Sequence, residues 1–156
     1  MKVKDLLHTL FHRRCKLTPI ENAILRKVAE SLSASSRSVF DLQVSLINKI
    51  QRIDKGREVD LYHIVNGKPY YPEAALFPQR KEEFELAKLK VRDDQTGHAA
   101  TVLVYLVQGR LFSIEFSSPP GDWQDIESLS IDIERIADPM ISEPTVLPST
   151  TFAKLE

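Results

Sequence analysis

The residues whose spacing best suits chemistry are Asp5, His8, His12 and Cys15, close to the start of the chain. On a helix, intervals of three, four and three place these side chains along one stripe, where two histidines and a thiolate can share a metal ion. Thr9 follows His8, so the general base of a His-Glu-x-x-His zinc site is missing, and the sequence has no second ligand cluster. We therefore expect no metal site, and His8, His12 and Cys15 are only its weak candidate ligands.

Nucleophilic and acid–base catalysis have little support. No serine stands in a Gly-x-Ser-x-Gly elbow, and the basic neighbours of Cys15 would lower its pKa without supplying a triad. His63 and His98 fall within or beside predicted strands, and the paired carboxylates at residues 82–83 and 93–94 stand at turns, where solvation explains them. Neither a P-loop nor a dinucleotide-binding glycine motif is present. We expect no catalytic residues and no cofactor.

Four aromatic residues lie in proline-containing loops instead of periodic elements: Tyr70, Tyr71, Phe77 and Trp123. Aromatic side chains in such places are favoured anchors for protein contacts. The alternative is that these loop residues fold down and close the end of the core, and it is at least equally consistent with the sequence. We take the four as candidate partner-binding residues.

Two helices are predicted to position these residues. The first covers residues 2–14, because its apolar residues recur at intervals of three and four. The second begins at Pro19, where Thr18 and Glu21 form a Thr-x-x-Glu capping box, and its apolar stripe runs from Ile20 to Leu32. Helices joined by a short link pack as a hairpin, so both stripes are expected to face one core.

After residue 38 the pattern changes to the alternation typical of strands. Residues 39–53 are predicted as a strand with a bulge or bend at Leu46–Ile47. A helix fits the same letters, with one apolar side made of Val39, Leu42, Leu46, Ile50 and Ile53. Asn66-Gly67 is a strong two-residue hairpin signal. The predicted strands then cover residues 59–65, 68–71, 84–91, 99–107 and 111–117, followed by an acidic edge strand over residues 129–134.

A two-residue turn at Gln108-Gly109 would set the register of the two strands beside it. Val107 would pair with Arg110, and Tyr105 would pair with Phe112. The main core face is then predicted to carry Leu103, Tyr105, Phe112, Ile114 and Phe116. The opposite face is mixed and needs only partial cover, from a helix, the tail or a second copy of the chain.

Composition bounds the fold. The chain has 156 residues, 42% of them hydrophobic and 28% charged, so it can form a core and still dissolve. Residues 1–136 are predicted to form one α+β domain, with two N-terminal helices packed on a bent, mostly antiparallel sheet of five or six strands. Three prolines after residue 136 predict an extended tail over residues 137–156. At fold level this arrangement resembles the cystatin-like and cone-shaped α+β folds.

Charge and cysteine content limit the partners. The net charge is -1, but residues 98–156 hold three basic residues against nine acidic ones, so that part could dock a basic partner or face the basic N-terminal third. The sequence has no long apolar run and no leader pattern, and its single cysteine is typical of a reducing compartment. We expect a cytoplasmic protein that binds neither nucleic acid nor membrane.

Two functional interpretations follow. The leading one is a non-catalytic module that binds another protein, as bacterial immunity proteins, antitoxins and secretion adaptors of this size do. The alternative is an enzyme or small-ligand domain with a pocket between its helices and its sheet, where His63, Tyr105 and Glu115 would be the polar lining. A homodimer is compatible with both interpretations.

Overall fold

The computed structural model describes residues 16–121, 123 and 126–141. The predicted first helix, with the candidate metal ligands His8, His12 and Cys15, lies outside the described residues, as do residues 142–156 of the predicted tail.

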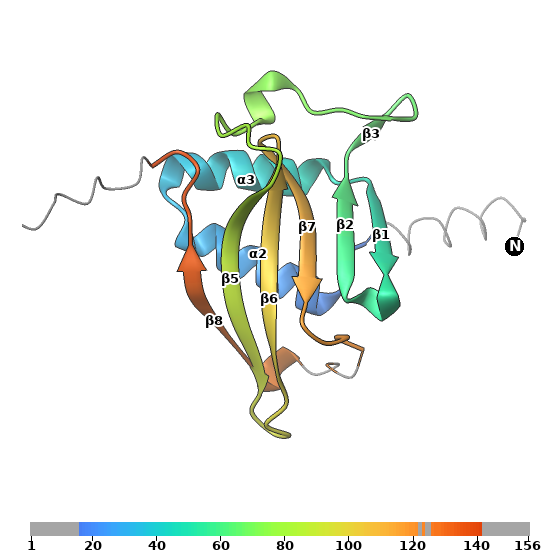
Figure 1. Ribbon diagram of the computed structural model, residues 1–156, viewed down its shortest axis with the longest axis vertical. Coiled ribbons are helices and arrows are strands. Elements are labelled where there is room, and N and C mark those ends of the chain that lie inside the picture. The colour runs from blue at the N-terminus through green and yellow to red at the C-terminus, as the bar shows by residue number, and fades with distance from the viewer. Residues whose placement is uncertain (1–15, 122, 124–125, 142–156) are drawn as a thin grey trace, which may run out of the picture.

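Two helices pack against one face of a six-stranded antiparallel sheet, whose strand order is β1-β2-β7-β6-β5-β8 (Figure 1). The helices are α2 (Pro19–Ser31) and α3 (Ala34–Leu46). The strands of this sheet are β1 (Lys49–Ile53), β2 (Glu58–Tyr62), β5 (Phe84–Asp93), β6 (Ala99–Val107), β7 (Arg110–Phe116) and β8 (Leu129–Ile136). A separate hairpin pairs β3 (Ile64–Val65) with β4 (Lys68–Pro69), and three short 3₁₀ turns are Asp54–Gly56, Glu73–Ala75 and Ile126–Ser128. The predicted α+β architecture is confirmed.

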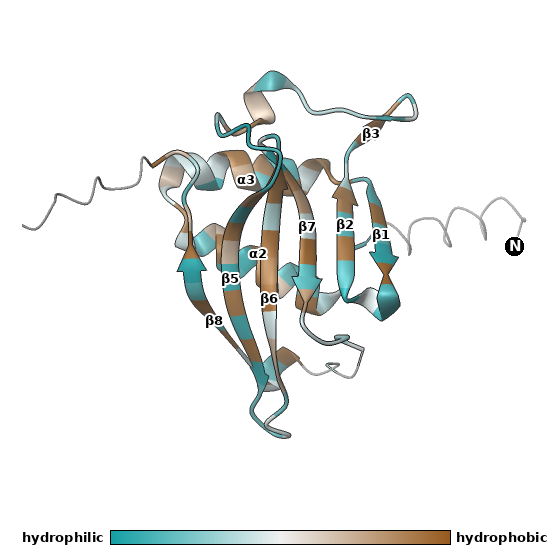
Figure 2. Ribbon diagram, in the orientation of Figure 1, coloured by the Kyte–Doolittle hydropathy of each residue, from teal (hydrophilic) through white to brown (hydrophobic). Residues whose placement is uncertain are grey.

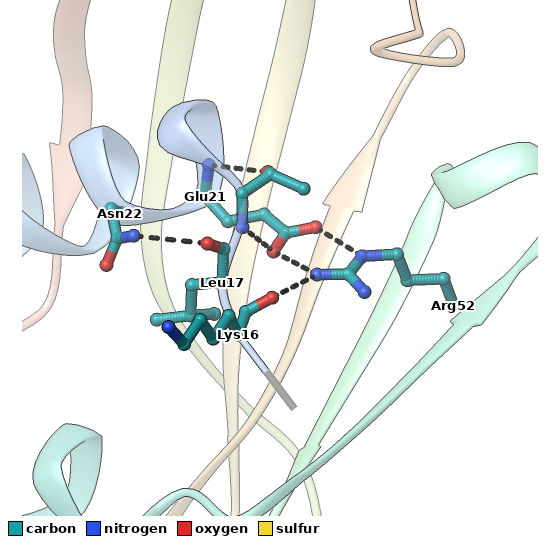
Figure 3. Close-up of polar contacts among 6 residues, drawn as sticks. Lys16, Leu17, Glu21, Asn22 and Arg52 are labelled. Atoms are coloured by element: carbon teal, nitrogen blue, oxygen red, sulfur yellow. Dashed lines mark hydrogen bonds and ion pairs between the residues drawn. The ribbon is translucent and has the colours of Figure 1, made fainter. Parts of the chain in front are cut away.

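The start of α2 is held by the predicted capping box and by an ion pair from the sheet (Figure 3). Thr18 Oγ1 accepts from the Glu21 amide at 3.3 Å, and a Glu21 carboxylate oxygen accepts from the Thr18 amide at 2.8 Å. Arg52 on β1 donates from Nε and Nη2 to the two oxygens of Glu21, each at 2.8 Å, and also to the carbonyl of Lys16. Glu21 is only 2% exposed, so this two-point contact supplies the counter-charge that a buried carboxylate needs.

The prediction of a strand over residues 39–53 is wrong for residues 39–46, which belong to helix α3, and is confirmed for residues 49–53, which form β1. Ser33 caps this helix, and Ser36, Phe40 and Gln43 are buried along one side at intervals of four and three. Short apolar runs fit both periods, and packing against the sheet decides between them. The strand that follows, β1, begins only at Lys49.

The turn at Gln108-Gly109 is confirmed, but the predicted register beyond it is wrong. Val107 does pair with Arg110, yet a bulge between Tyr105 and Leu106 shifts the pairing, so that Tyr105 lies opposite Ser113. The shift brings Val102, Val104 and Leu106 to the helix-covered face, where each is fully buried. Leu103, Tyr105 and Phe112, which were predicted for the main core, are only partly buried and belong to the other face.

The layer between the helices and the sheet is filled by apolar side chains. The fully buried side chains there come from both helices and from the central strands, and include Ile24, Val28, Phe40, Leu89 and Ile114. Hydrophobic and hydrophilic bands follow one another along β5 and β7, whereas β6 is hydrophobic for most of its length (Figure 2). The opposite face of the sheet is covered by no helix or strand in the described part of the chain (Figure 1). We call it the bare face.

The start of the predicted tail is attached to the fold. The amide of Ala137 donates to the Leu86 carbonyl at 2.8 Å. The carboxylate of Asp138 accepts from the Ser33 amide at 2.8 Å and from the Ser36 hydroxyl, so it joins Ser33 at the N-terminus of α3. Residues 137–141 therefore help to hold the second helix.

Candidate functional site

The structure places the four candidate aromatic residues in two different environments. Phe77 is fully buried, and Tyr71 and Trp123 are 8% and 6% exposed. These three rings close the end of the core, which is the alternative to partner binding that we gave for the loop aromatics. Trp123 packs beside His98 and Phe116, with ring centroids 5.5 and 6.4 Å away. Only Tyr70, at 54% exposure, presents its ring to solvent. A contact between Tyr70 and a partner stays a prediction.

Of the three candidate pocket residues, two come together and one does not. Tyr105 and Glu115 line the same hollow, of about 410 Å³, on the bare face. His63 does not line it: its Nδ1 lies 2.6 Å from the carbonyl of Tyr70, and its ring contacts Tyr71. The hollow is therefore on the outer side of the sheet. The pocket expected for an enzyme or small-ligand domain was between the sheet and the helices.

Three elements form the hollow. The bulge in the pairing of β6 and β7 places Phe112 and Ser113 side by side where a regular register would place one residue. The segment that leads into β5 adds two acidic residues at the rim. The lining consists of Glu82, Glu83, Tyr105, Val107, Phe112, Ser113 and Glu115.

Strand β2 brings two more carboxylates to the border of the hollow. Glu58 pairs with Glu115, and Asp60 pairs with Ser113, in the antiparallel register of β2 and β7. Asp60 is 6% exposed; its Oδ2 accepts from the Tyr62 hydroxyl at 3.3 Å, and its Oδ1 has no hydrogen-bond partner among the described residues. A buried carboxylate oxygen without a donor is rare in folded proteins, and it is the least satisfied part of this site.

The electrostatics of these carboxylates follow from their crowding. Burial, together with the neighbouring charge of Glu58, raises the pKa of Asp60. Burial, followed by the charges of Glu58 and Glu83, likewise raises the pKa of Glu115. Both effects disfavour the ionised form, because each carboxylate has lost water and gained like-charged neighbours. A cation bound among these carboxylates would favour their ionised forms and so lower the pKa values of Asp60 and Glu115.

Aromatic rings border the acidic groups. The rings of Tyr62 and Phe112 meet edge to face with centroids 5.9 Å apart, and Lys49 Nζ lies 5.7 Å from the Tyr62 ring centre. Burial raises the pKa of Tyr105, and the charge of Glu115 adds to that effect. The hollow thus combines carboxylates with the faces and edges of aromatic rings, which is the surface chemistry that binds cationic groups.

The bare face divides into a neutralised side and an acidic side. On the β5–β8 side, ion pairs join Arg135 with Glu85 and Lys88 with Glu134. Five other carboxylates, on β2, on β7 and in the segment before β5, form no ion pair with any cation in the described part of the chain. We call these five residues the acidic patch: Glu58, Asp60, Glu82, Glu83 and Glu115.

Sequence analysis singled out Glu115 but missed Glu58 and Asp60. On β2 these two residues alternate with buried Val59 and Leu61, which is the ordinary pattern of a half-exposed strand. Their importance comes from the pairing of β2 with β7, which joins residues more than fifty positions apart in the sequence.

Several other chemistries have no support in the described residues. Nowhere in residues 16–121, 123 and 126–141 do three or more His, Cys, Asp or Glu side chains gather as metal ligands. In the same residues, no helix has the length and apolar character needed to cross a membrane. Comparison with known proteins gives no match to a family model, to a curated protein or to a solved structure.

Proposed function

We propose that this chain is a non-catalytic protein-interaction module that binds a basic partner protein through the bare face of its sheet. The observation that carries the proposal is the acidic patch, where five carboxylates gather in and beside one hollow without a described counter-charge, whereas Glu85 and Glu134 on the same face form ion pairs. Charge of one sign on a binding surface steers and selects a partner of the opposite sign. A cytoplasmic location, suited to a single cysteine, belongs to the same proposal.

The shape of the molecule supports binding by a surface. The layer between helices and sheet is filled, with Ile24, Phe40 and Leu89 fully buried, so the space that a buried substrate would need is occupied. The bare face offers partly exposed Leu103, Tyr105 and Phe112 across neighbouring strands. Apolar and aromatic groups bordered by charges are typical of the central part of a protein interface.

The experiment that tests the proposal is photo-crosslinking from the bare face. p-Benzoylphenylalanine is placed at position 103 on β6 and, as a matched control, at position 42, where another leucine is 41% exposed on α3. In cells that produce the chain, we expect a discrete protein adduct from position 103 and none from position 42. Equal crosslinking from the two positions, or none from position 103, would refute binding at this face.

A binding measurement then tests the interface with purified proteins. The crosslinked partner is titrated into the unsubstituted chain and into Leu103→Lys and Leu42→Lys variants, and heat is recorded. Because Leu103 lies opposite Glu115 in the pairing of β6 and β7, a lysine there would neutralise part of the acidic patch and repel a basic partner. We therefore expect Leu103→Lys to raise the Kd by about tenfold or more. Leu42→Lys should leave the Kd unchanged, and the same Kd for both variants would contradict the proposal.

A further inference from the structure

The described lining of the hollow at the centre of the acidic patch includes no positively charged side chain. Glu115 lies on the wall of the hollow, with Glu82 and Glu83 at its rim and Glu58 beside it on β2. Burial and the negative charges of Glu58, Glu83 and Asp60 raise the pKa of Glu115, and a hydrogen bond with Ser113 opposes them in part. Like charges held this close repel one another whenever the carboxyl groups are ionised, and a cation bound between them would offset that repulsion.

Asp60 lies next to the lining of the hollow without forming part of it. It is 6% exposed, it borders the hollow beside Ser113, and its Oδ1 has no partner among the described residues. Its neighbour Glu58 can offer it a hydrogen only when one of the two carboxyl groups is protonated. A bound group rich in N–H donors would add positive charge to this crowded corner and favour the ionised form of both groups.

The walls of the hollow select the kind of cation. Tyr105 and Phe112 present aromatic rings, and Val107 adds an apolar edge. A guanidinium is flat, is weakly hydrated, stacks on aromatic rings and donates two parallel hydrogen bonds to one carboxylate. A bare metal ion needs several oxygen or nitrogen ligands around one point, and the described residues offer no such group.

We infer that the hollow of Tyr105, Phe112 and Glu115 receives an arginine side chain of the partner protein. The guanidinium donates to the carboxylate of Glu115 and lies against the two rings. This inference rests on the proposed function and names the chemistry by which the partner is held.

The test uses the full-length chain, labelled with nitrogen-15, and N-acetyl-arginine methylamide as the probe. N-acetyl-citrulline methylamide is the control, because it has nearly the same shape without the charge. We expect saturable shifts of the Tyr105, Ser113 and Glu115 amide signals with the arginine compound only. Equal shifts with the two compounds, or no shift at these three amides, would overturn the inference.

Two matched variants remove the same charge from the same face. Glu115→Gln removes the carboxylate of the hollow, and Asp132→Asn removes an exposed one on β8, three strands away. We expect Glu115→Gln to weaken binding of the arginine compound by about tenfold, as loss of a hydrogen bond between charged groups does, and Asp132→Asn to have no effect. Equal affinity in both variants would overturn the inference. The raised pKa of Glu115 predicts that Glu115→Gln melts no lower than the unsubstituted chain, so weaker binding would not result from unfolding.

The same variants separate this inference from the proposed function. If the partner found by crosslinking binds Glu115→Gln with unchanged Kd, the bare face is still the interface but the arginine contact is wrong. If Glu115→Arg abolishes binding and an arginine-to-glutamate change in the partner restores it, the contact is established. If sedimentation shows that the chain dimerises and Glu115→Gln prevents it, the arginine comes from a second copy, and a separate partner is refuted.

Discussion

Gln43 is the residue whose replacement should best test how α3 is held against the sheet. It is fully buried, and its Nε2 donates to the carbonyls of Ala75 at 2.6 Å and Gly109 at 2.9 Å. Its Oε1 accepts from the amide of Leu111 at 2.6 Å. One side chain thus ties the helix to the 3₁₀ turn before β5 and to the turn between β6 and β7.

We expect Gln43→Leu to destabilise the protein strongly. The Gly109 carbonyl keeps a second donor, the Phe77 amide at 3.0 Å, but the Ala75 carbonyl and the Leu111 amide lose the side-chain partner they have in the structure. Each buried group left unpaired costs about 1–3 kcal/mol, so the two together cost roughly 3 kcal/mol or more. In a domain of this size that corresponds to a fall in melting temperature of about 10 °C.

The measurement is urea unfolding followed by circular dichroism, with Gln51→Leu as the control. Gln51 is exposed on β1, so its replacement should change the free energy of unfolding by no more than about 0.5 kcal/mol. If Gln43→Leu and Gln51→Leu unfold at the same urea concentration, the three hydrogen bonds of Gln43 do not hold the helix in the way we describe.

Gln43→Glu adds a test with a defined dependence on pH. Its carboxylate would face the two carbonyl oxygens of Ala75 and Gly109, so the folded protein should bind a proton there and the pKa of the new group should rise. A raised folded pKa gives stability that is complete below the unfolded pKa of about 4.3 and is lost as pH rises through the folded value. We expect near-native stability at about pH 4 and a deficit at about pH 8, whereas a deficit independent of pH would refute this.

Two further predictions concern Asp138 and Gly109. Burial opposes ionisation of Asp138, but hydrogen bonds from Ser36, Ser33 and Met140 outweigh this effect and lower the pKa of its carboxyl group. The stability that Asp138 adds is therefore present above the unfolded pKa and is lost as the pH falls through the folded pKa. Asp138→Ala should therefore cost about 1 kcal/mol at neutral pH. In acid-unfolding curves the difference from the unsubstituted chain should shrink as the pH falls below the unfolded pKa of about 3.9, and a difference that stays constant there would contradict this. Gly109→Ala, at φ +79°, would place a Cβ 2.6 Å from the Phe77 carbonyl oxygen, whereas Gly67→Ala, at φ +75°, meets nothing within 4 Å. Thermal melting should show about 1–2 kcal/mol of backbone strain at position 67 and clearly more at position 109, and equal losses would refute the clash.

Elements specified by neighbouring residues were predictable from the sequence. Thr18, Pro19 and Glu21 determine where α2 begins, because capping bonds form between residues three positions apart. Asn66 and Gly67 both have positive φ, as a tight hairpin turn requires. The long apolar run of β6 lies between β7 and β5, and its every second residue is buried.

Other features depend on contacts between distant parts of the chain. Residues 39–46 could pair as a strand or pack as a helix, and only the filled layer against the sheet selects α3, with Phe40 and Gln43 inside. The bulge beside Tyr105 reverses which residues face the helices, because a shift of one residue moves a side chain to the opposite side of a sheet.

The acidic patch itself exists only in the folded chain. Residues 58 and 60 lie on the second strand, residues 82 and 83 in the segment before the fifth, and residue 115 on the seventh. Composition and periodicity determined that the chain forms helices and an antiparallel sheet, because those signals arise between near neighbours. The pairing of β2 with β7 decided which carboxylates lie close together without a described cation. Only the complete core imposes that pairing.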